Sequence, residues 1–173
     1  MVYREEIQNI QSKGGSPTYV NITDEVREII KKSGIKEGVV HVISPHTTCS
    51  VFFEEFVHDR MPDGKEFLLQ DLDNCLKKII PDQTAWGQYY YPGTMHFEDV
   101  ETWPDYLKYL PSGTREELMN ADAHLRSTIL GSSATFALEE GKLATGKTGY
   151  IYFVDFDRTH PRSRRCKVVV MGE

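Results

Sequence analysis

A histidine and two hydroxyl side chains interrupt an apolar stretch of the sequence. The segment VISPHTTCSVFFEE, residues 42–55, places His46, Thr47 and Thr48 between two runs that alternate like strands. A plain hairpin turn would carry Gly, Asn or Asp at such a junction. Hydroxyl groups beside exposed backbone N–H groups suit oxyanions such as phosphate. The junction is therefore a candidate binding site, and a histidine that only bonds the turn backbone is the simpler alternative.

The second run carries a carboxylate onto an apolar face. Cys49, Val51 and Phe53 share one face of the expected strand, and Glu55 continues their alternation. A carboxylate on that face requires a cation, a metal ion or a cluster of hydrogen-bond donors. If the strand ends before Glu55, this side chain is solvated instead.

A second polar cluster lies in NADAHLRSTILGSS, residues 120–133. Asp122 and His124 are two residues apart, so they point to different sides of a regular helix. They can serve one site only if the helix begins near Asp122. The alternatives are an N-cap or a pair with Arg126 for Asp122, and a contact with Thr128 for His124.

His96 is a further candidate, on an aromatic loop beside Glu98 and Asp99, although a solvated loop histidine is the simpler interpretation. Converging imidazole and carboxylate groups would suit a divalent cation such as Mg²⁺ or Zn²⁺. No pair of these residues has HExxH-like spacing. The prediction of a metal site therefore depends on the fold, and its candidate ligands are His46, Glu55, His96 and His124.

The segment RTHPRSRR, residues 158–165, holds four arginines in eight residues of an acidic protein. Arg162 and Arg164 share the alternation of the apolar side chains that follow, which should face the core. A guanidinium group at the mouth of a core-facing row can bind an anion with two hydrogen bonds. The anion is either a phosphate or a structural carboxylate such as Asp155 or Asp157.

The elements that must position these residues are mainly strands. Apolar stripes and end signals predict helices over residues 23–33, 65–80 and 115–130, and Gly34 should end the first. Residues 81–114 have no regular pattern and are rich in aromatic residues, which is typical of a lid or an oligomer contact. Strands are expected at 2–10, 16–22, 38–44, 49–53, 149–156 and 165–171, with a hairpin turn at Gly141.

These elements predict an α+β fold with a single domain over residues 1–173. It should be a mainly antiparallel β-sandwich with about three helices packed outside. The net charge of −6 disfavours binding to nucleic acid or to an anionic membrane. The sequence has no long apolar run and no apolar signal core, and its three cysteines form no CxxC pair. We therefore expect a cytoplasmic protein with reduced thiols.

Five ordered segments resemble a known family: PHTTCSVFFEE, NADAHLRSTILGSS, LEEGKLATG, IYFVDFD and PRSRR. Together they resemble the YjbQ-type family, the secondary thiamine-phosphate synthases, over nearly the whole chain. The chain departs from the family pattern at Glu54, where Asn is common, and at 146–149, where Gly-Thr-Trp-Gln is common. The resemblance implies a sandwich of antiparallel sheets, a homotrimer, and a polar cleft shared with a neighbouring subunit.

The resemblance also implies a reaction, in which an aminopyrimidine pyrophosphate joins a thiazole phosphate with loss of pyrophosphate. His46 or His124 would bind the metal ion or donate to the leaving group, and Glu55 and Asp122 would hold the metal ion or orient a histidine. A metal-dependent hydrolase of a phosphorylated small molecule, or a non-catalytic trimer that binds an anionic metabolite, are the alternatives. The residues that the resemblance assigns to the substrate are Thr47, Thr48, Arg162 and Arg164.

Overall fold

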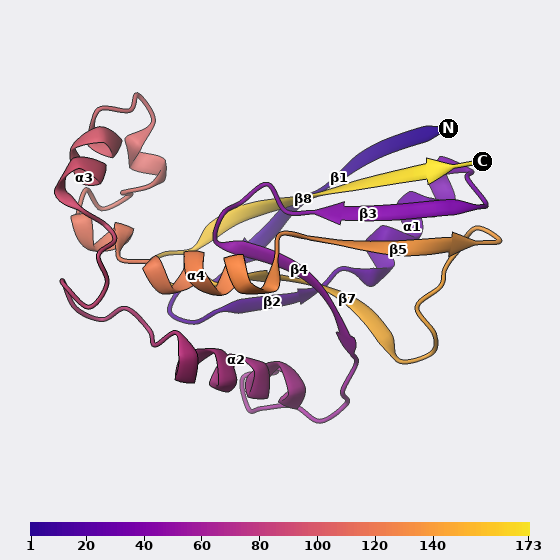
Figure 1. Ribbon diagram of the computed structural model, residues 1–173, viewed down its shortest axis with the longest axis horizontal. Coiled ribbons are helices and arrows are strands. Elements are labelled where there is room, and N and C mark those ends of the chain that lie inside the picture. The colour runs from indigo at the N-terminus through magenta and orange to yellow at the C-terminus, as the bar shows by residue number, and fades with distance from the viewer.

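Two antiparallel sheets face each other in the computed structural model, which describes residues 1–173 (Figure 1). The strand order is β1-β8-β3-β5-β6 in the five-stranded sheet and β2-β7-β4 in the three-stranded sheet. The strands are β1 (Val2–Ser12), β2 (Thr18–Asn21), β3 (Gly38–Ile43), β4 (Cys49–Glu55), β5 (Ser133–Glu139), β6 (Lys142–Leu143), β7 (Gly149–Asp155) and β8 (Arg162–Gly172). The α+β sandwich predicted from the sequence is confirmed.

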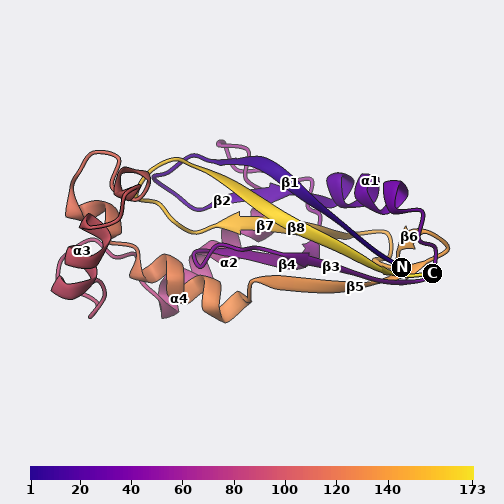
Figure 2. The same ribbon diagram turned by 90° about the horizontal axis from the view of Figure 1, so that it is seen from above.

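Helices surround the sheets and extend the molecule at one end. The α-helices are α1 (Thr23–Ser33), α2 (Phe67–Ile79), α3 (Thr94–Glu101) and α4 (Ala121–Leu130), and the 3₁₀ turns are η1 (Tyr106–Lys108) and η2 (Arg115–Leu118). The two termini lie side by side at one end of the molecule, and α3 lies beyond the sheets at the opposite end (Figures 1 and 2). No helix is long and apolar enough to cross a membrane.

The main core fills the space between the two sheets and α1. Alternate residues of β3 and β8, such as Val40 and Val168, point into this space and are fully buried. Cys49 and Cys166 are buried there as free thiols, as expected. The strand β7 is buried on both faces because Ile151 and Phe153 point into this core, whereas Val154 points to the opposite side of the sheet and packs in a second core.

A second core lies on the other face of the three-stranded sheet. Leu76 of α2 and Ala123 of α4 pack there against Val154 and Phe156. The contact fixes α4 beside β4, where the Ser127 hydroxyl donates to the Cys49 carbonyl oxygen at 2.8 Å. This bond holds the middle of α4 against the first residue of β4.

The helix predicted over residues 115–130 is two elements. A 3₁₀ turn ends at Leu118, and α4 begins only at Ala121. Tertiary hydrogen bonds explain the break: the Asn120 amide donates to Asp157 at 2.9 Å, and the Ala121 N–H donates to Gln83 at 2.9 Å. The prediction of one continuous helix was wrong because long-range partners capture its middle residues.

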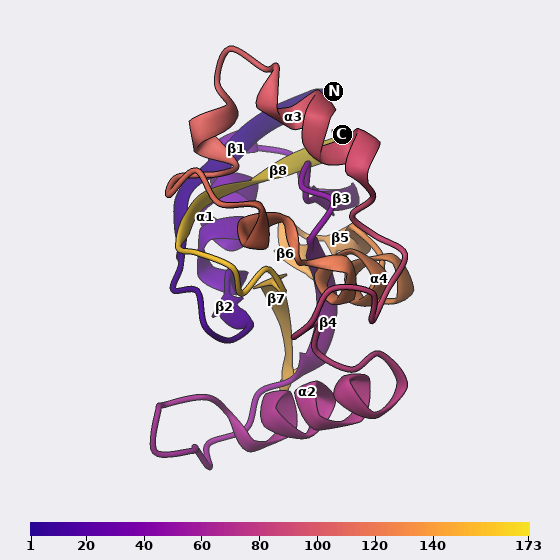
Figure 3. The same ribbon diagram turned by 90° about the vertical axis from the view of Figure 1, so that its left-hand side faces the viewer.

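The segment predicted as irregular forms a small unit of its own. Within it, the helix α3 and the turn η1 pack around Phe97, Val100, Leu110 and Leu118. Figure 3 views the molecule from the end at which α3 lies. We call residues 84–119 the α3 segment. Its aromatic side chains supply a local core, and this accounts for regular structure in a stretch without periodicity.

Candidate functional site

A pocket of about 340 Å³ lies where β4, β8 and α4 begin. It brings together most of the residues that the sequence singled out, although they come from four separate parts of the chain. Two larger hollows, of about 600 and 420 Å³, contain none of those residues. The pocket is lined by Pro45, His46, Thr47, Thr48, Tyr91, His96, Val100, Trp103, Tyr109, Leu118, Asn120, His124, Asp157, Arg162 and Arg164.

His46 takes the place of a missing strand residue. Pairing between β3 and β8 stops at Ile43 and Lys167, because the chain turns away at Pro45. The Arg165 backbone N–H, which would otherwise lack a partner, donates to His46 Nε2 at 3.2 Å. This bond assigns the ring proton to Nδ1. Burial, with the nearby Arg164 guanidinium, lowers the pKa of His46 and favours the neutral ring.

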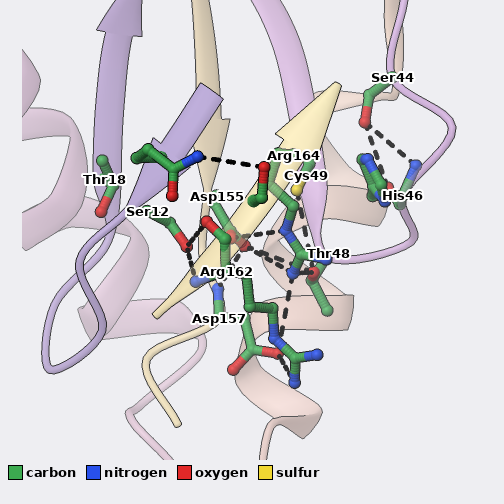
Figure 4. Close-up of polar contacts among 12 residues, drawn as sticks. Ser12, Thr18, Ser44, His46, Thr48, Cys49, Asp155, Asp157, Arg162 and Arg164 are labelled. Carbon is green, nitrogen blue, oxygen red and sulfur yellow. Dashed lines mark hydrogen bonds and ion pairs between the residues drawn. The ribbon is translucent and has the colours of Figure 1, made fainter. Parts of the chain in front are cut away.

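Arg164 is held by a buried carboxylate. Its Nε lies 2.7 Å from Asp155 Oδ2, and its Nη2 donates to Asp155 Oδ1 at 3.2 Å and to Thr48 Oγ1 at 3.0 Å. The side chains of Arg164 and Asp155 are 10% and 1% exposed. Figure 4 shows this group where β7 ends and β8 begins. The inward direction predicted for Arg164 is confirmed, and the anion it meets inside the chain is a carboxylate.

Arg162, two residues before Arg164 in β8, is also paired with a buried carboxylate. Its Nη2 lies 2.9 Å from Asp157 Oδ2, which also accepts a hydrogen bond from the Asn120 amide at 2.9 Å. Burial raises the pKa of Asp157, but Arg162 and hydrogen bonds from Thr159 outweigh it and the pKa is lowered. Asp157 is therefore a carboxylate that binds Arg162 firmly, and the buried Arg162 Nε and Asn120 Oδ1 atoms have no partner in the chain.

The rings of Tyr91, His96 and His124 also line the pocket. The Tyr91 hydroxyl lies 3.1 Å from His96 Nε2, and the Tyr91 ring meets His124 edge-on at 5.3 Å. Burial lowers the pKa of His124 and raises that of Tyr91 to about 12. His96 and His124 thus share one neighbour, and both line the same pocket as Arg162 and Arg164.

The two predicted carboxylates lie elsewhere. Glu55 is exposed at the far end of β4, and it is six residue steps from Cys49 along the strand, or about 20 Å. Asp122 is 1% exposed and does not line the pocket. It accepts a hydrogen bond from Arg158 at 2.9 Å and lies 3.7 Å from Arg126. The expected pairing of these carboxylates with His46 and His124 is therefore corrected.

A family model described as "UPF0047 protein YjbQ-like" matches residues 8–173. The chain belongs to this YjbQ-like family. A UPF0047 protein of Archaeoglobus fulgidus is 32% identical over 149 residues, which cover 86% of this chain and 87% of the relative. The UPF0047 protein YugU of Bacillus subtilis is 28% identical over 153 residues, covering 88% and 89%.

Solved structures of YjbQ-like proteins have the same fold. A YbjQ-like protein of unknown function from Sulfolobus solfataricus superposes with a TM-score of 0.68 at 27% identity, covering 100% of this chain and 99% of that one. A yjbq/upf0047 family protein from Clostridium acetobutylicum gives 0.66 at 24% identity, covering 98% and 99%. These relatives support the family and the fold of this chain.

A protein-held divalent cation does not fit the pocket of this YjbQ-like chain. No group of three or more His, Cys, Asp or Glu side chains converges enough to hold a metal ion. The Nε2 atoms of His46 and His96 are already hydrogen-bonded, Glu55 is remote, and the pocket carboxylate Asp157 is paired with Arg162. The predicted ligands His46, Glu55, His96 and His124 therefore do not form a ligand set in this fold.

Several pocket residues had no sequence signal that singled them out. Tyr91, Trp103 and Tyr109 belong to an aromatic-rich run in which no position differs from its neighbours. Asn120 could have been found, because it opens the motif that contains Asp122 and His124. Its contact with Asp157 requires two segments that are far apart in the sequence to meet, and a local sequence pattern does not predict such a contact.

Proposed function

We propose that the pocket binds a phosphorylated small molecule and catalyses the transfer that the family resemblance implies. The observation that carries this proposal is the free edge of the two arginines. The Nη1 atoms of Arg162 and Arg164 have no hydrogen-bond partner in the chain, although both side chains are about nine-tenths buried. Planar donors of this kind match phosphate oxygens.

The donors around this edge are neutral or already balanced in charge. Arg162 and Arg164 are paired with Asp157 and Asp155, so these four groups have no net charge. A phosphate would therefore be bound by directed hydrogen bonds more than by net positive charge. Exposed Thr47 and the Nδ1–H of neutral His46 add donors at the same wall. Thr48 is committed to Arg164 and has a positioning role.

The proposed step forms one bond and breaks one bond. A thiazole nitrogen attacks the methylene carbon of the aminopyrimidine pyrophosphate, and the carbon–oxygen bond to pyrophosphate breaks. Pyrophosphate leaves with the electron pair. Hydrogen bonds from Arg162, Arg164 and His46 would stabilise the charge that develops on the leaving oxygens. His124, neutral because its pKa is lowered by burial, would contact the organic part of the substrate.

We also propose the homotrimer and the cytoplasmic location expected from the sequence. Apolar side chains support an assembly, because Val39 and Met171 on the five-stranded sheet and Leu125 and Ile129 on α4 are at least 37% exposed. The free thiols are consistent with a reducing compartment. Light scattering tests the trimer, and a monomer at micromolar concentration would contradict it.

Calorimetric titration with pyrophosphate, followed by product analysis with both substrates, tests the function. We expect Arg164→Lys to weaken pyrophosphate binding about tenfold, because lysine keeps the charge and loses the planar pair of donors. Arg165→Lys is the matched control, since Arg165 is the next residue of β8 and is 56% exposed. Unchanged affinity in Arg164→Lys would refute the phosphate site. Thiamine phosphate supports the transferase, free phosphate supports a hydrolase, and binding without turnover supports an anion-binding protein.

A further inference from the structure

The pocket has two chemically different walls. One wall is polar and comes from the β3–β4 junction, the segment that follows β7, and the start of β8. The other comes almost entirely from the α3 segment and is aromatic and apolar. The members of the second wall are Tyr91, His96, Val100, Trp103, Tyr109 and Leu118.

The aromatic wall is held in place by the protein itself. Gln83 joins the two ends of the α3 segment, because its amide donates to the Tyr91 carbonyl at 2.9 Å and accepts from the Ala121 N–H at 2.9 Å. Gln83 is 5% exposed, so water competes little for these bonds. Within the segment, Arg115 binds Glu101 through two hydrogen bonds of 2.8 Å. The aromatic wall is therefore preorganised by contacts within the protein.

Two rings of this wall are open to a ligand. Trp103 is partly exposed and Tyr109 is 37% exposed, and their rings meet edge-on at 5.1 Å. The Trp103 indole N–H donates to Asp99 at 3.1 Å, which fixes the ring orientation. Large rings that are held in position and left partly uncovered beside a polar wall provide a stacking surface for a planar group.

We propose that Trp103 and Tyr109 bind a planar ring of the ligand, so that the α3 segment determines which phosphorylated molecules the pocket accepts. The proposal rests on the proposed function, because it assumes that the phosphate lies at Arg162 and Arg164. A volume of about 340 Å³ accommodates a small ring together with its phosphate. Phosphate recognition and ring recognition then belong to different parts of the chain and can be separated by mutation.

Phenyl phosphate and methyl phosphate are suitable probes, because they share the phosphate monoester and differ in the ring. We expect the wild-type protein to bind phenyl phosphate roughly three- to tenfold more tightly, the range given by one aromatic contact. Trp103→Ala should reduce this ratio towards one and leave methyl phosphate binding unchanged. The control is Trp86→Ala, because Trp86 belongs to the same segment, packs on Phe97 and does not line the pocket.

Each outcome separates the two proposals. Equal affinity of the wild type for both phosphates would contradict ring binding by Trp103 and Tyr109, and so would an unchanged ratio of the two affinities in Trp103→Ala. Neither result would contradict the phosphate site. Binding of neither phosphate would overturn both. If Trp103→Ala fails to fold, Trp103→Leu retains apolar volume without an aromatic face and should give the same loss of ratio. A ratio that falls equally in Trp86→Ala would show that the segment acts only through stability.

Discussion

Replacing Arg164 with methionine should destabilise the protein by about 3 kcal/mol even without ligand. Asp155 is 1% exposed, and its Oδ2 lies 2.7 Å from Arg164 Nε. Removing one partner of a buried ion pair typically costs about 3–5 kcal/mol, because the other charge is left unpaired. The lower end of the range applies because Asp155 retains a 3.0 Å hydrogen bond from the Asp157 N–H. Such a loss is a large part of the roughly 5–15 kcal/mol that stabilises a domain.

Urea unfolding followed by circular dichroism measures this free energy. The double variant Arg164→Met, Asp155→Asn should recover about 2 kcal/mol relative to the sum of the two single variants, because no unpaired charge remains in it. Arg165→Met is the control, since its side chain is 56% exposed and should change stability by less than about 0.5 kcal/mol. A loss below about 1 kcal/mol in Arg164→Met, or additive single effects, would show that the pair is not a buried structural unit.

Two further predictions concern pH and packing. Burial lowers the pKa values of His46, His124 and His160 from 6.5, so the unfolded chain binds more protons than the folded chain as the pH falls. The stability gained from these neutral rings is therefore complete above about pH 6.5 and is lost as the pH falls below it. Urea titrations at several pH values should show this loss in the free energy of unfolding. His124→Gln should make that free energy depend less steeply on pH. Gly149→Ala should cost about 1–3 kcal/mol, because an added Cβ would lie 2.6 Å from a backbone carbonyl oxygen. Gly93→Ala, with nothing within 4 Å, should cost much less in the same unfolding assay, and equal losses would contradict the steric argument.

The sequence by itself determined the features that depend on local periodicity and end signals. Alternation predicted the inward face of Arg162 and Arg164, and both side chains point into the protein. Charged residues at the helix ends and a glycine stop predicted α1, which ends at Gly34 with φ 70°. Both patterns succeed because residues two apart in a strand, or within one turn of a helix, have neighbours that the sequence already specifies.

Only the tertiary structure decided which candidates share a pocket. His46 and His124 both line the pocket. Glu55 lies at the far end of β4, and Asp122 lies outside the pocket, where it pairs with Arg158. The pattern left open whether Arg164 meets a phosphate or a carboxylate, and the fold pairs it with a carboxylate. The sequence pattern also did not predict the structure of the α3 segment, because that structure depends on its own aromatic core and on Gln83, which joins its two ends. Contacts between residues far apart in the chain form only when many weak interactions act together, and no single stretch of sequence records them.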